Sequence, residues 1–313
     1  MKIKLISVLV AFFILIGCGV AFSVEGSSPK TGKVTVIDDF GREVVIEKYP
    51  GKIVSLSPSN TEILFALGLG DKIIGVTSYC DYPPEVKQID KIGGYSTPNI
   101  EKIVAKDPDL VLAAYGNGEE NIAALEKLGL TVAALNPKNI EDILKDIQLV
   151  GKITGEEKKA KQITTEMRKR IEIVREKNAK IPEDKKMRVL YLVWYPQLWT
   201  SGKETYPDEL IKIAGGKNIA YDIKGWKQIN KETVIDRDPQ IIICSGMGEN
   251  GVVIKKNILN DPELKKTIAV KSGCVYAISD SNIIERPGPR IVEGLEKIDE
   301  LIEESYSKIK EGK

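Results

Sequence analysis

Short runs of aliphatic and β-branched residues alternate with amphipathic helical stretches in the first half of the chain. The apolar runs predict strands at residues 53–56, 73–76, 110–112 and 131–133. Helical periodicity lies between and after them, in stretches that begin near residue 59 and that cover 100–105, 121–128 and 140–153. Strands that alternate with helices predict βαβ units and a mostly parallel sheet.

The second half repeats this scheme. Its clearest strands are expected at 189–192, 241–243 and 275–278, and a long helix at 291–309 closes the chain. Two short apolar runs within 33–48 predict a β-hairpin ahead of the first lobe. The pattern therefore predicts an α/β fold with an N-terminal lobe at 33–153 and a C-terminal lobe at 182–313.

A segment at 154–181 separates the two halves. Thr154 and Glu157 have the spacing of a capping box, and neither Gly nor Pro occurs between Gly155 and Pro182. Flexible linkers are rich in Gly and Ser, whereas this segment has apolar residues at three- and four-residue spacing. We expect one long rigid helix that joins the lobes and allows them little relative movement.

The N-terminus has the pattern of an export signal. Lys2 and Lys4 precede an apolar run at 5–16, which suits a signal peptide and is short for a membrane span. The run ends in LIGC, which resembles a bacterial lipobox with Cys18 as the lipidated residue. We predict a lipoprotein signal peptide at 1–18, a flexible tether at 19–32 and anchoring outside the cytoplasmic membrane. The alternative is a plain secretory signal that contains a cysteine.

Composition excludes several classes of function. Of the 313 residues, 42% are hydrophobic and 29% charged, and the formal net charge is +1. These values are typical of a globular protein and give no reason to expect a nucleic acid as partner. The chain has no histidine, which excludes His-based metal sites and Ser-His-Asp triads. We predict no metal site.

Three cysteines remain after Cys18, an odd number for an exported protein. Cys244 and Cys274 fall in the same half of the chain and can form a disulfide, or both can be buried thiols. Cys80 is expected to be a small packing residue.

An internal repeat indicates where a ligand binds. Residues 94–101 read GYSTPNIE and residues 225–232 read GWKQINKE, so that Gly, an aromatic residue, Asn and Glu coincide. Ligands of open α/β sheets bind beyond the carboxyl ends of the strands, which places Tyr95 and Trp226 on opposite sides of one cleft. Alternatively, the aromatic rings pack locally and the Glu residues only favour the helix dipole.

Further aromatic residues fall in comparable loops, although aromatic residues make up only 6% of the chain. They are Tyr79, Tyr82, Tyr115 and Trp199. A cleft lined by aromatic rings and a few polar groups suits a large, flat, partly apolar ligand.

Four motifs resemble one known family. They are SPSNTE at 57–62, SYCDYPP at 78–84, TSGKE at 200–204 and ERPGPR at 285–290. In this order they are similar to the periplasmic vitamin B12-binding proteins, the solute-binding partners of cobalamin ABC importers. The similarity covers most of residues 34–305. The long linking helix also resembles the wider class III periplasmic binding proteins, which include siderophore and haem binders.

The resemblance implies roles for particular residues. The aromatic walls of the ligand site would be Tyr79, Tyr95, Tyr115, Trp199 and Trp226. Asn282 and Arg286 would lie at the cleft edge, although residues 280–284 differ in length from the family pattern. Glu101 and Glu232 would dock with arginines of the permease. The resemblance also implies a monomer that carries cobalamin or a related corrinoid as cargo, not as a catalytic cofactor, to a permease dimer with its ATPase subunits.

Other functions are less consistent with the sequence. A ferric siderophore or haem carrier would use the same scaffold but would want more basic residues or Tyr aimed at the chelate. A nucleotide-dependent enzyme is disfavoured because TSGK at 200–203 lacks the earlier glycine and the Gly-Lys-[Ser/Thr] order of a P-loop. A structural surface protein would leave the repeated aromatic loops unexplained. We therefore expect a binding protein and not an enzyme.

Overall fold

The computed structural model describes residues 33–246 and 250–312. It begins with an antiparallel hairpin of β1 (Val34–Ile37) and β2 (Glu43–Ile46), as predicted. Asp38 fixes the turn, because its Oδ1 accepts hydrogen bonds from the backbone N–H groups of Phe40 and Arg42, both at 3.0 Å. Such a side-chain cap is typical of Asp in tight turns.

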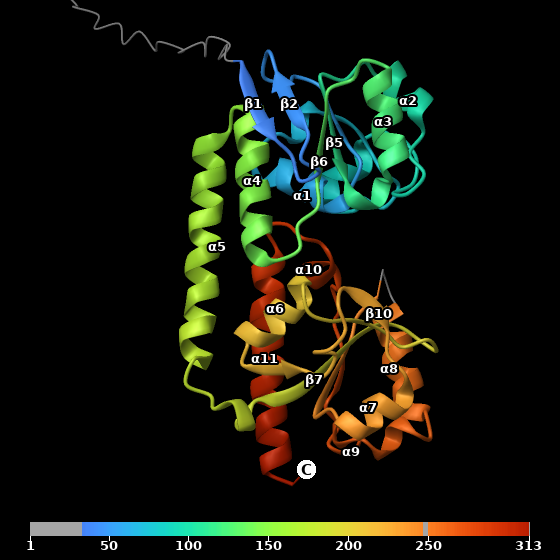
Figure 1. The fold of residues 1–313 in the computed structure, drawn as a ribbon, viewed down its shortest axis with the longest axis vertical. Coiled ribbons are helices and arrows are strands. Elements are labelled where there is room, and N and C mark those ends of the chain that lie inside the picture. The colour runs from blue at the N-terminus through green and yellow to red at the C-terminus, as the bar shows by residue number, and fades with distance from the viewer. Residues whose placement is uncertain (1–32, 247–249, 313) are drawn as a thin grey trace, which may run out of the picture. The chain divides into compact units, whose positions relative to one another are not determined.

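The first lobe is built on a fully parallel sheet in the order β4-β3-β5-β6 (Figure 1). Its strands are β3 (Ile53–Ser55), β4 (Ile73–Val76), β5 (Leu110–Ala114) and β6 (Val132–Leu135). Its helices are α1 (Pro58–Ala66), α2 (Ile100–Ala105), α3 (Glu119–Lys127) and α4 (Ile140–Thr154). All residues of β5 are buried, as expected of a parallel strand covered on both faces.

The second lobe contains a mixed sheet in the order β10-β8-β7-β11-β12, with β9 also paired to β7. Its strands are β7 (Met187–Trp194), β8 (Trp199–Ser201), β9 (Gly216–Asn218), β10 (Trp226–Gln228), β11 (Ile241–Cys244) and β12 (Val275–Ala277). The pairs among β7, β9, β11 and β12 are parallel, whereas β8 and β10 add an antiparallel edge.

Helices cover this sheet and close the chain. They are α6 (Tyr206–Ile213), α7 (Lys231–Arg237), α8 (Asn250–Asn260), α9 (Ile268–Lys271), α10 (Asn282–Glu285) and α11 (Ile291–Lys310). Single 3₁₀ turns occur at Gly70–Lys72, Pro84–Gln88, Tyr115–Asn117, Glu183–Lys185 and Leu264–Lys266. The predicted α/β class, with two lobes of mostly parallel sheet, is confirmed.

The linking helix α5 (Glu157–Asn178) connects α4 to the second lobe (Figure 1). The predicted capping box at Thr154 is wrong, because Thr154 ends α4 and its Oγ1 donates to the carbonyl of Val150 at 2.7 Å. Gly155 follows with φ +79°, the left-handed conformation in which glycine commonly ends helices. The linking helix therefore begins three residues later than predicted. The lobe boundaries at 153 and 182 stay predictions.

The core joins the two lobes. One cluster of buried residues includes Ile53 of β3, Met167 of α5, Tyr191 of β7 and Leu295 of α11. Each lobe also has one smaller cluster of its own, packed against its sheet. Because residues of both lobes share one core, moving the lobes apart would expose apolar surface.

The described cysteines Cys80, Cys244 and Cys274 are free and buried, so the disulfide alternative for the last two is wrong. Burial raises the pKa of the Cys244 thiol to about 12, which keeps it protonated. Cys18 and its predicted signal peptide and tether lie outside the described residues. Within 33–246 and 250–312, none of the helices combines the length and apolar character of a membrane span.

Candidate functional site

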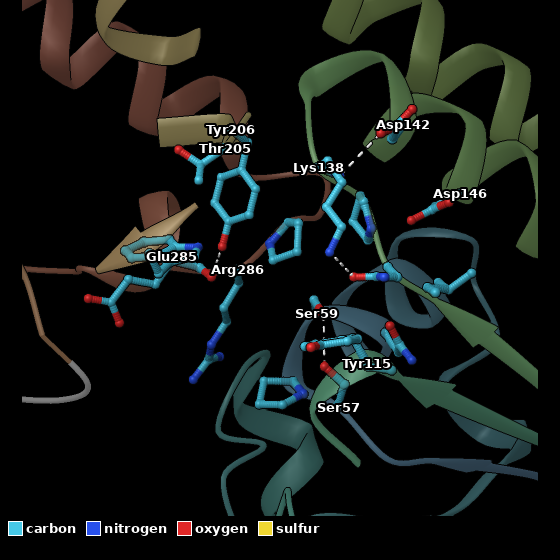
Figure 2. Close-up of a pocket in the computed structure, with 18 of the residues that line it drawn as sticks. Ser57, Ser59, Tyr115, Lys138, Asp142, Asp146, Thr205, Tyr206, Glu285 and Arg286 are labelled. Carbon is cyan, nitrogen blue, oxygen red and sulfur yellow. Dashed lines mark hydrogen bonds between the residues drawn. The ribbon is translucent and has the colours of Figure 1, made fainter. Parts of the chain in front are cut away.

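A cavity of about 1400 Å³ lies between the lobes (Figure 2). In the first lobe its walls come from the start of α1 and from the segments that follow β4, β5 and β6. In the second lobe they come from 204–209, 224–226 and 282–287. The cavity thus lies beyond the carboxyl ends of the first sheet's parallel strands, where α/β folds bind ligands.

Trp226 and Tyr206 form the aromatic wall of the second lobe. The two rings meet edge to face with centroids 6.4 Å apart, and Trp226 meets the buried ring of Tyr191 at 6.2 Å. The hydroxyl of Tyr206 donates to the carbonyl of Glu285 at 2.8 Å. Thr205 caps the helix that begins with Tyr206 and so fixes the position of this ring.

Tyr206 was not predicted from the sequence. Its signal is an aromatic residue between a capping threonine and Pro207, directly after the motif at 200–204. Because Tyr206 begins a helix and does not lie in a loop after a strand, the pattern of loop aromatics does not identify it.

Tyr79, Tyr95 and Tyr115 line the cavity from the first lobe. Tyr79 and Tyr115 are exposed, whereas burial of Tyr95 raises the pKa of its phenol. Gly116 is required beside Tyr95, since a Cβ there would lie 2.2 Å from the tyrosine ring. The amide of Asn117 donates to the carbonyl of Tyr95 at 2.7 Å and holds this loop. Aromatic rings from both lobes therefore face one cavity.

Trp199 is placed differently from the other predicted aromatic residues. It lies on β8 opposite Gln228, and it is not among the described residues that line the cavity. Its side chain is exposed. A ligand contact by Trp199 stays a prediction.

Asn282 and Arg286 line the cavity, and their contact with a ligand stays a prediction. The Arg286 guanidinium donates to Glu62 Oε1 at 3.0 Å and to Asp81 Oδ1 at 2.7 Å (Figure 2 shows its side chain). It also reaches the carbonyl of Tyr79 at 3.4 Å. Arg286 thus holds the loop that carries Tyr79, and most of its donors are already used.

Two carboxyl groups at the cavity lie in environments that favour the neutral acid. Asp146 is 2% exposed, and burial together with the nearby charge of Asp39 raises its pKa to about 9. Its Oδ2 has no hydrogen-bond partner within the described part of the chain. Burial also raises the pKa of Glu285, whose Oε1 accepts a hydrogen bond from Ser245.

Most other charges at the cavity are paired. The ion pairs are Arg286 with Glu62 and Asp81, Lys212 with Asp208, Lys224 with Glu204, and Lys145 with Asp142. Among the described lining residues, this leaves the ammonium of Lys138 and the carboxylate of Glu209 without an ion-pair partner. The described lining residues carry four cationic and seven carboxyl side chains, so the cavity has no excess of positive charge.

Glu101 and Glu232 lie away from the cavity. They are on two helices that occupy equivalent positions in the two copies of the repeat. Each is exposed in the first turn of its helix, α2 or α7. Asn99 accepts a hydrogen bond from the N–H of Lys102, and Asn230 accepts one from Thr233 in the same way. The predicted repeat therefore has a structural counterpart in both lobes.

The repeat extends past these helices. Asp107 and Asp238, which end the two repeats, both have positive φ, at 46° and 40°.

For residues 33–246 and 250–312, no group of three or more His, Cys, Asp or Glu side chains is arranged to hold a metal.

Two α/β lobes around a large cavity lined by aromatic rings are typical of a binding protein. Residues 53–281 match the family described as periplasmic binding protein, and the chain belongs to that family. It is a solute-binding component of an ABC transporter, and the members of its family are transport proteins, not enzymes.

Two relatives cover most of the chain. One is the uncharacterized ABC transporter substrate-binding lipoprotein YvrC of Bacillus subtilis, 35% identical over 305 residues, which are 95% of each chain. The other is the vitamin B12-binding protein of Photorhabdus laumondii, 30% identical over 260 residues, 82% of this chain and 90% of the relative. The periplasmic binding protein family supports an extracytoplasmic location.

Solved structures show the same fold. A possible iron-binding (periplasmic solute-binding) protein from Staphylococcus epidermidis is 30% identical, with a TM-score of 0.70 over 82% of this chain and 99% of that one. The periplasmic vitamin B12 binding protein BtuF of Vibrio cholerae is 26% identical, with a TM-score of 0.71 over 82% and 98%. The haem-binding protein BhuT, 20% identical with a TM-score of 0.73 over 81% and 98%, shows the fold alone.

Proposed function

We propose that this protein captures cobalamin or a closely related corrinoid outside the cytoplasmic membrane and delivers it to an ABC permease. The observation that carries the proposal is the cavity itself. Its volume of about 1400 Å³ exceeds the roughly 300–1,000 Å³ of ordinary small-molecule sites. Aromatic rings line it from both lobes, as a large flat macrocycle requires.

The charges of the cavity favour a corrinoid over an anionic iron chelate. A corrin ring carries uncharged amides at its edge, which hydrogen-bond to acids, amides and hydroxyls. A chelate or haem with several negative charges would call for an excess of cations, since electrostatic complementarity governs recognition. The described lining residues offer only Lys138 as an unpaired cation. The vitamin B12-binding relatives at 30–33% identity support the same choice.

The proposal includes export, anchoring and delivery. Cys18 would carry the lipid anchor, and Cys18→Ser should release the protein from the membrane. Glu101 and Glu232, one on each lobe, would contact the two subunits of a permease dimer. The binding protein would act as a monomer, with no catalytic step of its own.

The test is an absorption spectrum. Purified protein is mixed with cyanocobalamin, desalted and scanned, with haemin and a ferric siderophore in parallel samples. A corrin spectrum that elutes with the protein, at a stoichiometry near one, is the expected result. Retention of haemin or the ferric chelate without any corrinoid would contradict the proposal and support an iron carrier on this scaffold.

A further inference from the structure

Lys138 occupies a defined position in the cavity. It lies in the segment between β6 and α4. Its backbone N–H donates to Asp142 Oδ2 at 3.2 Å, and this hydrogen bond fixes the backbone from which the side chain extends (Figure 2). Its Nζ donates to Asn136 Oδ1 at 2.6 Å and lies 4.8 Å from the centroid of the Tyr115 ring. The ammonium group is thus held above an aromatic ring that a flat ligand would contact.

The donors of Lys138 are not used up. An ammonium group has three N–H donors, and Asn136 accepts one of them. No carboxylate among the described residues forms an ion pair with Lys138, in contrast to Lys212, which pairs with Asp208, and Lys224, which pairs with Glu204. Lys138 can therefore meet an anion without breaking an existing ion pair.

The nearby carboxylates do not occupy the remaining N–H donors of the Lys138 ammonium group. The carboxylate of Asp142 accepts from the backbone of Lys138 and lies 3.8 Å from the ammonium of Lys145. Glu209 Oε2 accepts from the backbone N–H of Ile140 at 2.8 Å, at the start of α4. Both carboxylates are engaged with groups other than the Lys138 ammonium.

We propose that Lys138 recognises a single anionic group of the ligand at the edge of Tyr115, and that this group is the phosphodiester of the corrinoid nucleotide tail. The inference rests on the proposed function and extends it to ligand selection. The periphery of the corrin ring carries uncharged amides, so the phosphodiester is its one anionic substituent. Lys138 would then select complete corrinoids over the same macrocycle without its tail.

The experiment compares cyanocobalamin with dicyanocobinamide, which lacks the nucleotide and its phosphate. Calorimetry measures the affinity of both ligands for the wild-type protein, Lys138→Met, Lys138→Arg and Lys127→Met. A hydrogen bond to a charged group contributes enough for about a tenfold to hundredfold change in affinity. Lys138→Met should lose about that much for cyanocobalamin and less than about threefold for dicyanocobinamide.

The other variants separate charge from shape. Lys138→Arg should keep most of the preference because it keeps the charge. Lys127→Met should behave as wild type because Lys127 is an exposed residue at the end of α3, outside the described lining of the cavity. The wild-type preference should shrink in high salt, which screens the phosphate but not the stacking of the nucleobase. Binding of dicyanocobinamide shows that each variant is folded.

Two results would overturn the inference. One is an equal loss of affinity for both ligands in Lys138→Met, which would show a general packing role. The other is unchanged cyanocobalamin affinity in that variant. If the wild-type protein bound neither corrinoid, the proposed function itself would fail, and the inference with it.

Discussion

Glu62 and Arg290, which are 228 residues apart in the sequence, form a two-point ion pair between the lobes. Arg290 Nε donates to Glu62 Oε2 and its terminal nitrogen to Oε1, both at 2.8 Å. The same carboxylate also accepts from Arg286, and the more exposed carboxylates of Asp81 and Asp280 pair with Arg286 and Arg290. The side chain of Glu62 is only 2% exposed. This cluster ties α1 to the segment between α10 and α11.

Glu62→Gln should therefore destabilise the protein strongly. The substitution removes the one buried carboxylate of the cluster and leaves the two guanidinium groups only the exposed partners Asp81 and Asp280, at a cost of about 3 kcal/mol in the free energy of unfolding. Urea unfolding measures the change. The control is Glu300→Gln, which breaks the exposed pair with Lys297 and should cost less than about 0.5 kcal/mol. Equal effects of the two substitutions would show that the cluster does not hold the lobes together.

Local patterns in the sequence predicted most of the fold. Runs such as 110–112 and 241–243 lie in buried strands because a parallel strand is apolar on both faces. The Asn that the repeat aligns is Asn99 in one lobe and Asn230 in the other, and each caps its helix because a helix start depends on residues within one turn. The start of the linking helix was misplaced because Gly155 was assigned to its first turn, whereas it ends the preceding helix.

The candidate site was only partly predictable, because much of it depends on contacts distant in the sequence. Tyr206 at the start of α6 meets the ring of Trp226 only in the folded protein, where two segments 20 residues apart come together. Asp146 is one of several acids along α4, and only its burial near Asp39 distinguishes it. The ion pair of Arg286 with Glu62 could not be inferred from spacing. Prediction therefore succeeded for residues in the repeated loops and failed for residues whose role arises from tertiary packing.

Asp146 should make stability depend on pH. Its folded-state pKa of about 9 lies above the ordinary value of 3.8 for Asp, so the folded protein holds a proton that the unfolded chain releases. This contribution is complete below about pH 4 and is lost as the pH rises through about 9, by up to about 1.4 kcal/mol per pH unit.

Asp146→Asn should remove this slope, and the variant should gain stability relative to wild type as the pH rises from 4 to 9. Urea unfolding at several pH values gives the difference. Asp236→Asn, in an exposed position of α7, is the matched control and should follow wild type. A parallel pH dependence of Asp146→Asn and wild type would mean that the carboxyl of Asp146 is ionised in the folded protein.

Trp226 should be required for tight corrinoid binding. Its ring forms part of the cavity wall and is positioned by the edge contacts with Tyr191 and Tyr206. Loss of ring area and of favourable aromatic geometry should weaken binding by about tenfold or more in Trp226→Ala. Calorimetry with cyanocobalamin measures this, and unchanged thermal unfolding confirms the fold. The matched control is Trp194→Ala, an exposed tryptophan that does not line the cavity among the described residues; equal losses in both would place the ligand elsewhere.

The double variant Glu101→Ala with Glu232→Ala should separate capture from delivery. Each Glu alone can be explained by the helix dipole, which is worth roughly 0.3–1 kcal/mol. Their equivalent places in the two repeats fit a two-fold permease dimer, which presents the same basic surface to each lobe. Charge complementarity of this kind sets orientation and association rate. Corrinoid affinity and unfolding should stay nearly unchanged, while uptake by cells and complex formation with the permease should fall sharply.

The control for this double variant must carry the same loss of charge. Glu120→Ala with Asp236→Ala removes one exposed acid from each lobe, both outside the repeat positions. Uptake by this control should match wild type, because a general loss of negative charge would not remove the paired contacts. If the Glu101 and Glu232 variant transported normally, or if both variants lost transport equally, the two residues would serve only their helices, and docking would depend on other surfaces.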